Sequence, residues 1–228
     1  METSGGECVA YAILRIKKLK TSGSLAAAGA HIHRKRPTPN ADPNRGIECI
    51  HGTDDIKLDV AHRLLTGCKE PTKRRKNAVL AVEMLLTASP EWFRDGGSVE
   101  SWTDHCIAWL DARYGKNCVN VCRHDDETTN PHIHAVIVPI TPDGRLSCDE
   151  FFGTPKKLSK LQDDFAECMK PFGLERGIPR THTKRKHQHV RRFYEMCNQV
   201  ESRLDVGLVI AKMHQATTKS KTVTRRMA

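Results

Sequence analysis

The chain has 228 residues, with 37 Lys and Arg against 27 Asp and Glu, and a formal net charge of +10 at pH 7. This length suits one domain with its own hydrophobic core, or one domain with an added tail, and the positive charge favours a polyanionic partner, either nucleic acid or an acidic membrane surface. No run of residues is apolar enough over the length of a membrane span, and the N-terminus lacks the pattern of a signal peptide, so we expect a soluble intracellular protein.

The N-terminal part predicts a strand followed by a helix. Residues 8–19 open with apolar residues and then alternate, which predicts a strand with one buried face. Ser22 or Ser24 can cap a helix that begins with the Ala-rich stretch Leu25–Ala30. The end of this helix is basic and carries His31, His33, Arg34, Lys35 and Arg36. The prolines that follow stop it.

The next part of the chain gives weaker signals. Residues 40–76 look irregular and basic, with a short helix around residues 58–65. The apolar stretch 78–88 fits a strand or a helix equally well. Ser98 is then expected to cap a helix over residues 99–114, whose apolar residues recur near helical spacing.

Two short segments rich in Val and Ile, residues 118–122 and 133–140, predict a pair of strands joined by a polar loop. Residues 141–144, with the sequence TPDG, predict a tight turn. Residues 145–151 are then expected to return as a third strand. The pattern favours an antiparallel sheet.

The C-terminal part predicts helices. Residues 156–172 form a helix with one buried face that ends at Gly173, and a last helix is expected over residues 189–213. Residues 212–228 carry basic and no acidic residues and are expected to form a mobile tail. Together these elements predict an α+β fold, with a central antiparallel β-sheet and helices on its faces.

The nine cysteines are an odd number and are scattered along the chain. Cys118 and Cys122 are four residues apart, but no second pair has the spacing of a zinc ribbon. We therefore interpret most of the cysteines as small buried apolar residues in a reducing compartment.

The segment from His124 to His134 carries the strongest chemical signal. His132 and His134 are two residues apart on a predicted strand, so both leave the same face of the sheet. His124 ends the neighbouring strand, and an antiparallel pairing would bring it opposite the other two. A single histidine here would most simply be a solvated residue, but three imidazoles converging on one point bind a transition metal. Asp126 and Glu127 are the nearby carboxylates, one as a direct ligand and another as an orienting partner.

Three neutral ligands leave a metal ion with net charge and open positions, which suits catalysis on a phosphate group. Attack by water would make the protein an ordinary hydrolase. Attack by a side chain would form a covalent intermediate and conserve the bond energy for rejoining. The residues of the metal site alone leave both readings open.

The chain resembles a known family in several places. The pattern His124-x-Asp126-Glu127 followed by Pro131-His132-x-His134, the strand Tyr11–Arg15, the helix that contains His31, and the segment Ile140–Ser147 are similar to the MobV (Pre/Mob) relaxases. These are plasmid mobilisation enzymes of the HUH endonuclease class. The resemblance covers residues 9–195 and is weakest over residues 40–100. It implies a relaxase domain over residues 1–195 and a C-terminal helix end with a basic tail over residues 196–228.

The resemblance also implies roles for individual residues. His31 would be the nucleophile that forms a phosphoramidate with the 5′ end of the nicked strand, with His33 as its close rival. Arg34 would clamp phosphate, and Glu127 would be the acidic companion of the metal ligands His124, His132 and His134. The metal would be Mn²⁺ or Mg²⁺, with Zn²⁺ as a third option. The implied location is the bacterial cytoplasm.

Three basic clusters are candidate contacts for DNA phosphates. They include the residues Arg34, Lys35, Arg36, Arg74, Arg75, Lys184, Arg185 and Lys186. Aromatic residues are few, so we expect sequence to be read from a duplex or hairpin beside the nick, with few unpaired bases stacked on the protein. The expected partners are single-stranded or hairpin origin DNA and other mobilisation or transfer proteins, without membrane insertion.

Two alternatives remain. The first is a replication initiator or transposase of the same class that uses Tyr194, the tyrosine on the basic C-terminal helix. Retention of a covalent DNA adduct after loss of His31 would favour it. The second is a non-catalytic DNA-binding regulator whose histidines hold a structural zinc ion. It predicts no cleavage with any metal and loss of the fold when the metal is removed.

Overall fold

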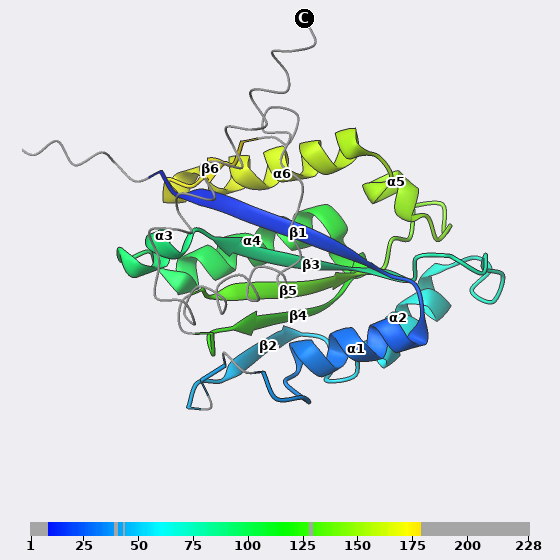
Figure 1. Ribbon diagram of the computed structural model, residues 1–228. Coiled ribbons are helices and arrows are strands. Elements are labelled where there is room, and N and C mark those ends of the chain that lie inside the picture. Colours follow the sequence, from blue (N-terminus) through cyan, green and yellow to red (C-terminus); the bar gives the residue numbers. More distant parts are fainter. Residues whose placement is uncertain (1–8, 39–40, 43, 128–129, 179–228) are drawn as a thin grey trace, which may run out of the picture. The chain divides into compact units, whose positions relative to one another are not determined.

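The computed structural model describes residues 9–38, 41–42, 44–127 and 130–178 (Figure 1). Within them one six-stranded sheet has the order β2-β4-β5-β3-β1-β6. The strands are β1 (Tyr11–Leu19), β2 (Ile47–His51), β3 (Ala81–Ala88), β4 (Cys118–His124), β5 (His132–Ile137) and β6 (Glu175–Arg176). All neighbouring strands are antiparallel except β1 and β6, which pair in parallel over two residues at one edge. The predicted α+β fold with a central antiparallel sheet is confirmed.

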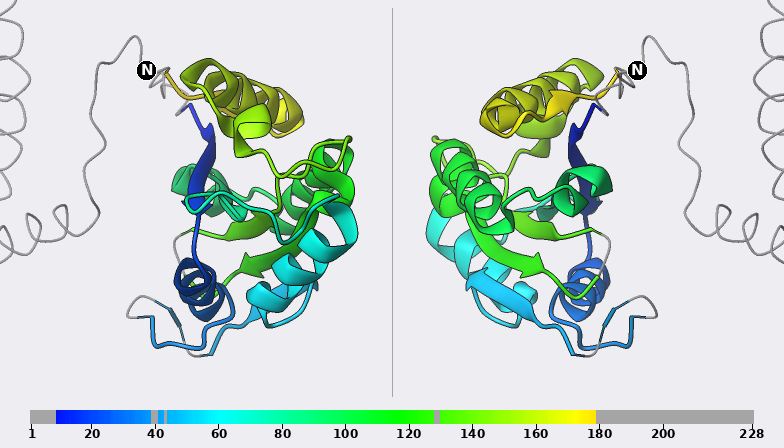
Figure 2. Two further views of the ribbon diagram at one scale, coloured as in Figure 1. Left: turned by 90° about the vertical axis from the view of Figure 1, so that its right-hand side faces the viewer. Right: turned by 90° about the vertical axis from the view of Figure 1, so that its left-hand side faces the viewer.

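The helices of the described residues cover both faces of this sheet. They are α1 (Ser22–Ile32), α2 (Ile56–Gly67), α3 (Pro90–Arg94), α4 (Val99–Tyr114), α5 (Cys148–Phe152) and α6 (Pro155–Met169), with single 3₁₀ turns at Gly115–Asn117 and Lys170–Phe172. Helices α1 and α2 lie side by side near β2 and β4, whereas α4 and α6 pack on the other side (Figures 1 and 2). None of the described helices is long and apolar enough to cross a membrane.

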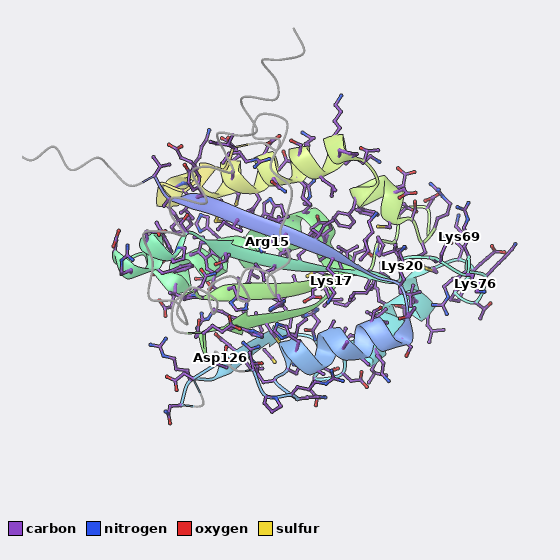
Figure 3. The ribbon with its side chains drawn as sticks, viewed as in Figure 1. Arg15, Lys17, Lys20, Lys69, Lys76 and Asp126 are labelled. Carbon is purple, nitrogen blue, oxygen red and sulfur yellow. The ribbon has the colours of Figure 1, made fainter. Side chains whose placement is uncertain are left out.

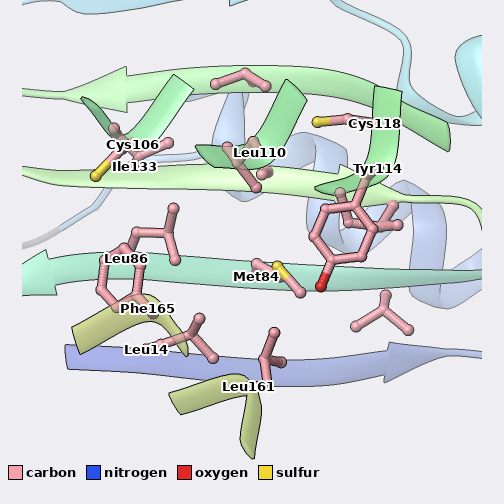
Figure 4. Close-up of a cluster of buried hydrophobic side chains, with 14 of the residues drawn as sticks. Leu14, Met84, Leu86, Cys106, Leu110, Tyr114, Cys118, Ile133, Leu161 and Phe165 are labelled. Atoms are coloured by element: carbon pink, nitrogen blue, oxygen red, sulfur yellow. The ribbon is translucent and has the colours of Figure 1, made fainter. Parts of the chain in front are cut away.

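Side chains of β5 alternate between two separate hydrophobic clusters. Ile133 and Ile137 join the cluster built on α4 and α6, which contains Leu110 and Phe165 (Figure 4). Val136 joins the cluster built on α1 and α2. Because successive strand residues face opposite sides, His132 and His134 face the side of α1 and α2.

The structure corrects the prediction of a third strand over residues 145–151. After the turn at 141–144 only one isolated bridge forms, between Ile140 and Leu146, and the chain then enters α5. Asp149 and Glu150 occupy the first turn of α5, where acidic residues favour a helix N-terminus, and Phe152 is buried at its end. Burial of this phenylalanine from a helix replaces the expected strand pairing.

Strand β2 was missed, because it lies in the segment that was expected to be irregular. It is short, pairs only with β4, and has a bulge between Cys49 and His51. Residues 81–88, which fitted a strand or a helix, form the buried strand β3 between β1 and β5. The expected last helix and basic tail, residues 189–228, lie outside the described residues.

The packing on the α4 side predicts a stability effect for one core residue. Leu110 is 1% exposed in this cluster. Leu110→Ala removes buried methyl groups and leaves a cavity, so the free energy of unfolding should fall by about 2–5 kcal/mol in a denaturant titration. The matched control is Asp104→Ala, an exposed position on the same helix, which should stay within about 0.5 kcal/mol of the wild type. Equal effects of the two substitutions would contradict this packing.

Candidate metal centre

The register of β4 and β5 brings three histidines together. His124 and His132 are direct cross-strand partners, and His134 lies two residues further along the same face. The ring centroid of His124 is 4.9 Å from that of His132 and 4.7 Å from that of His134, and the centroids of His132 and His134 are 5.0 Å apart. All three side chains are buried, and one ligand nitrogen of each lies within 4.8 Å of the others. This arrangement is the expected one, and we call it the histidine triad.

Each ring of the triad has one nitrogen beside a hydrogen-bond acceptor. Nε2 of His124 lies 2.8 Å from the carbonyl oxygen of Ile32, and Nδ1 of His132 lies 2.9 Å from that of Asn130. Nδ1 of His134 lies 3.1 Å from a carboxylate oxygen of Glu83. Since carbonyls and carboxylates only accept, these contacts favour the tautomer in which the contacting nitrogen carries the proton and the opposite nitrogen has a free lone pair.

The free nitrogens fit a metal ion. Nδ1 of His124 and Nε2 of His134 are buried and have no hydrogen-bond partner, and Nδ1 of His134 lies close to Glu83 without the alignment of a hydrogen bond. Buried polar atoms without partners are costly, and a bound cation removes that cost. The pKa of His124 is lowered to about 2 by burial and by the neighbouring His134, so its ring is neutral and able to act as a ligand. Orientation of ligand imidazoles by acceptors is typical of protein metal sites.

Glu83 is a component of this centre that the sequence analysis missed. It lies on β3, is 8% exposed, and bridges His134 to Nζ of Lys17 at 3.3 Å. Burial would raise the pKa of Glu83, but the contacts with His134 and Lys17 outweigh burial and the pKa is lowered. A single carboxylate in the mainly apolar stretch AVEMLLTA was the available signal, because a buried charge needs a partner.

Helix α1 places His31 beside the triad. The helix begins with a capping box, in which the backbone N–H groups of Ser24 and Thr21 each donate to the other's hydroxyl at 3.0 Å, so Thr21 is the N-cap and not Ser22 or Ser24. The ring centroid of His31, in the last turn, is 5.2 Å from that of His134. Desolvation, followed by the charge of Arg34, lowers the pKa of His31, although the residue is exposed on one side.

His31 and His33 point to different places. His33 is the C-cap of α1, and its Nδ1 lies 3.3 Å from Sγ of Cys49 and 3.7 Å from Sγ of Cys122. Of the two histidines, only His31 has a ring contact with the triad. The geometry therefore favours His31 as the residue that meets a ligand at the triad.

Arg34 joins the helix to the loop after β4. It donates to Asp126 through Nε at 2.6 Å and Nη2 at 2.8 Å, and Nη2 also donates to Glu127 at 2.9 Å. Asp126 is 3% exposed, and despite the opposing effect of burial its pKa is lowered by Arg34. Oxygens of Asp126 and Glu127 also lie within 4.8 Å of a nitrogen of His124, so these carboxylates adjoin the triad.

Two exposed basic residues lie on the sheet face that carries the triad, and others lie elsewhere on the domain. Arg15 and Lys17 are exposed on β1 and share the face of Glu83, and both were missed as candidate DNA contacts (Figure 3). Of the predicted contacts, four are exposed, and they are Lys35, Arg36, Arg74 and Arg75. Lys184, Arg185 and Lys186 lie outside the described residues. Figure 3 also places Lys20, Lys69 and Lys76 near the end of β1 that leads into α1.

Comparison with known proteins gives consistent matches. Residues 9–195 match the family model described as plasmid recombination enzyme, Mob_Pre. The chain is 40% identical over 195 residues to the 65 kDa protein of Zymomonas mobilis, covering 82% of this chain and 33% of that protein. It is 28% identical over 202 residues to plasmid recombination enzyme type 3 of Staphylococcus aureus, covering 81% and 48%. The chain thus spans a third to a half of the length of these relatives.

A solved structure has a similar fold, and nearly the whole of that solved chain is matched. It is the MobM relaxase domain (MOBV; Mob_Pre) bound to plasmid pMV158 oriT DNA, in a Mn-bound crystal structure. The TM-score is 0.70 at 26% identity, and the match covers 82% of this chain and 99% of that one.

The contacts of Arg34 predict a stability effect. Arg34→Met leaves the buried Asp126 without its counter-charge, so the free energy of unfolding should fall by about 2–3 kcal/mol, less than for a fully buried pair because the guanidinium is partly exposed. The control is Lys35→Met, whose partner Asp54 is exposed, and it should change the stability by no more than about 1 kcal/mol. Denaturant titration measures both, and an unchanged Arg34→Met variant would contradict the proposed pairing.

Proposed function

The chain belongs to the plasmid recombination enzyme (Mob_Pre) family, and from this premise we propose that it is a relaxase that nicks one strand at a plasmid transfer origin and rejoins it. The observation that carries the proposal is the histidine triad, with one nitrogen of each ring beside an acceptor and His31 next to it. This combines a site for a metal ion with an imidazole that is free to react.

His124, His132 and His134 would hold a divalent metal ion, with Mn²⁺ or Mg²⁺ as the first candidates. Manganese is bound in the MobM relaxase domain, which supports this assignment. When bound, such an ion polarises a phosphate oxygen and stabilises the charge that develops in the transition state. Asp126 and Glu127 would contribute negative charge beside it, held in place by Arg34. Glu83 would orient the ring of His134 through its contact with Nδ1.

The attacking group would be His31. Its lowered pKa keeps the imidazole neutral near pH 7, so a ring nitrogen has a lone pair available without a strong base. A bond forms between this nitrogen and phosphorus while the bond from phosphorus to the 3′ oxygen breaks. The ring gives up its proton, and the 3′ oxygen leaves as a hydroxyl group. Because the phosphoramidate conserves the bond energy, the 3′ hydroxyl can attack it and restore the strand.

The DNA would be held mainly through its phosphates. Arg15 and Lys17 lie on the face of the triad, and Lys35 and Arg36 follow the helix that carries His31. Positive charge at these positions suits the phosphates of DNA. The MobM relaxase domain is bound to oriT DNA, which supports origin DNA as the partner of this chain. Association with further mobilisation proteins, and action in the bacterial cytoplasm where plasmids reside, are part of this proposal.

The tyrosine alternative concerns Tyr194, and the other two tyrosines lie elsewhere in the fold. Tyr114 is buried in the α4 cluster, and Tyr11 begins β1. Tyr194 lies outside the described residues, so its role as a nucleophile is a question for experiment. A structural zinc ion is also less favoured, because the triad supplies three protein ligands where structural zinc sites have four and are usually rich in cysteine.

Replacing the nucleophile tests the reaction. His31→Ala should abolish the covalent protein–DNA adduct and reduce nicking of origin DNA by about 10³-fold or more. The readout is intact-protein and peptide mass spectrometry after incubation with single-stranded origin DNA and Mn²⁺. His62→Ala, an exposed histidine on α2, is the control and should retain both. An adduct on another residue, or nicking that survives in His31→Ala, would contradict the assignment.

Glu83 gives a second test through metal affinity. Glu83→Gln replaces the charged acceptor of His134 by a neutral one, so Mn²⁺ should bind about 10–100-fold more weakly. Calorimetric or electron paramagnetic resonance titration of Mn²⁺ measures this directly. Glu175→Gln, an exposed position on β6, should bind Mn²⁺ as the wild type does. Unchanged affinity in Glu83→Gln would remove Glu83 from the centre.

A further inference from the structure

A second cluster of potential metal ligands lies outside the histidine triad. Cys49 on β2 and Cys122 on β4 are direct cross-strand partners, and their sulfur atoms are 2.9 Å apart. Nδ1 of His33 lies 3.3 Å from the sulfur of Cys49 and 3.7 Å from that of Cys122. One ligand atom of each residue lies within 4.8 Å of the others.

The ligand types and distances suit a soft divalent ion. Zinc sites have Zn–S bonds of about 2.3 Å and Zn–N bonds of about 2.0–2.1 Å in tetrahedral geometry, which places neighbouring ligand atoms about 3.5–3.8 Å apart. The two N–S distances are close to this range. To bind one ion, the two sulfur atoms would have to move apart by about 1 Å at most. Cys49 can make this movement because it is exposed.

The position of His33 distinguishes a metal site from a disulfide. A disulfide would use the two sulfur atoms and give the imidazole no role, whereas an ion uses all three residues. His33 presents its Nδ1 to both thiols. Asp59, on the neighbouring helix α2, interacts electrostatically with both His33 and Cys122 and adds negative charge that favours a cation.

We propose that His33, Cys49 and Cys122 form a second metal site, which binds Zn²⁺ or a similarly soft divalent ion with three protein ligands and an open fourth position. Cys122 is fully buried and Cys49 is exposed, so the ion would enter from the side of Cys49. The site does not depend on the proposed relaxase reaction.

The location gives this site a structural consequence. His33 is the C-cap of α1, two residues after His31 and next to Arg34. An ion held here would attach the end of α1 to β2 and β4, in addition to the contact of His124 with the carbonyl of Ile32. It would therefore restrict the position of the helix end that carries His31.

Cobalt provides the direct test, because thiolate ligation of Co²⁺ gives a charge-transfer absorption in the near ultraviolet. The full chain is purified under reducing conditions, stripped with a chelator and titrated with Co²⁺. The wild type should show this absorption by two equivalents, since the histidine triad can take up one Co²⁺, and Zn²⁺ should displace it. Cys49→Ser and His33→Ala should lose or weaken it. His132→Ala, in the triad, and Cys168→Ser, a partly buried cysteine elsewhere, should retain it.

Absence of the absorption in the wild type, or its persistence in Cys49→Ser, would overturn the proposal. A second measurement avoids dependence on the folding of the variants. Alkylation of the wild type, read by peptide mass spectrometry, should show that Zn²⁺ protects Cys49 and leaves the labelling of Cys168 unchanged. Recovery of a Cys49–Cys122 disulfide from the reduced preparation, with no protection by Zn²⁺, would also overturn the metal site.

Discussion

The antiparallel register of β4 and β5 is the constraint on which the candidate site depends. It sets His124 directly opposite His132 and leaves His134 on the same face. A slip of one residue would turn His132 and His134 toward the cluster of α4 and α6, where their polar atoms would have no partners. The hydrophobic pattern opposes this slip, because Ile133, Ala135 and Ile137 are all fully buried on that side.

The surroundings of the triad explain how one sheet face becomes a reactive site. The acceptors of its three rings come from different parts of the chain: the end of α1, the loop before β5, and β3. The carbonyl oxygen of Ile32 is the acceptor for His124, and Ile32 directly follows His31 in the sequence. The end of α1 thus fixes the tautomer of the metal ligand His124 and also positions the candidate nucleophile His31. A change at this helix end should therefore affect both metal binding and the attack by His31.

The sequence predicted the triad because the two-residue period of a strand and a hairpin-like loop are local properties. The acceptors and the partners of Arg34 could not be predicted in this way. Glu83 lies in a stretch that fitted a strand or a helix equally well, and Arg34 meets Asp126 across 92 residues of sequence. Cys49 lies in a segment that was expected to be irregular. The expected strand after the TPDG turn was wrong, because burial of Phe152 from a helix determined that region.

The central claim concerns which ring nitrogens are free, and anomalous X-ray diffraction from crystals soaked with Mn²⁺ tests it most directly. The account predicts one anomalous peak within bonding distance of Nδ1 of His124 and of Nε2 of both His132 and His134. His31 should face that peak with its ring. A peak bonded through the opposite nitrogens, or manganese bound elsewhere with the three rings still in contact with their acceptors, would contradict the account.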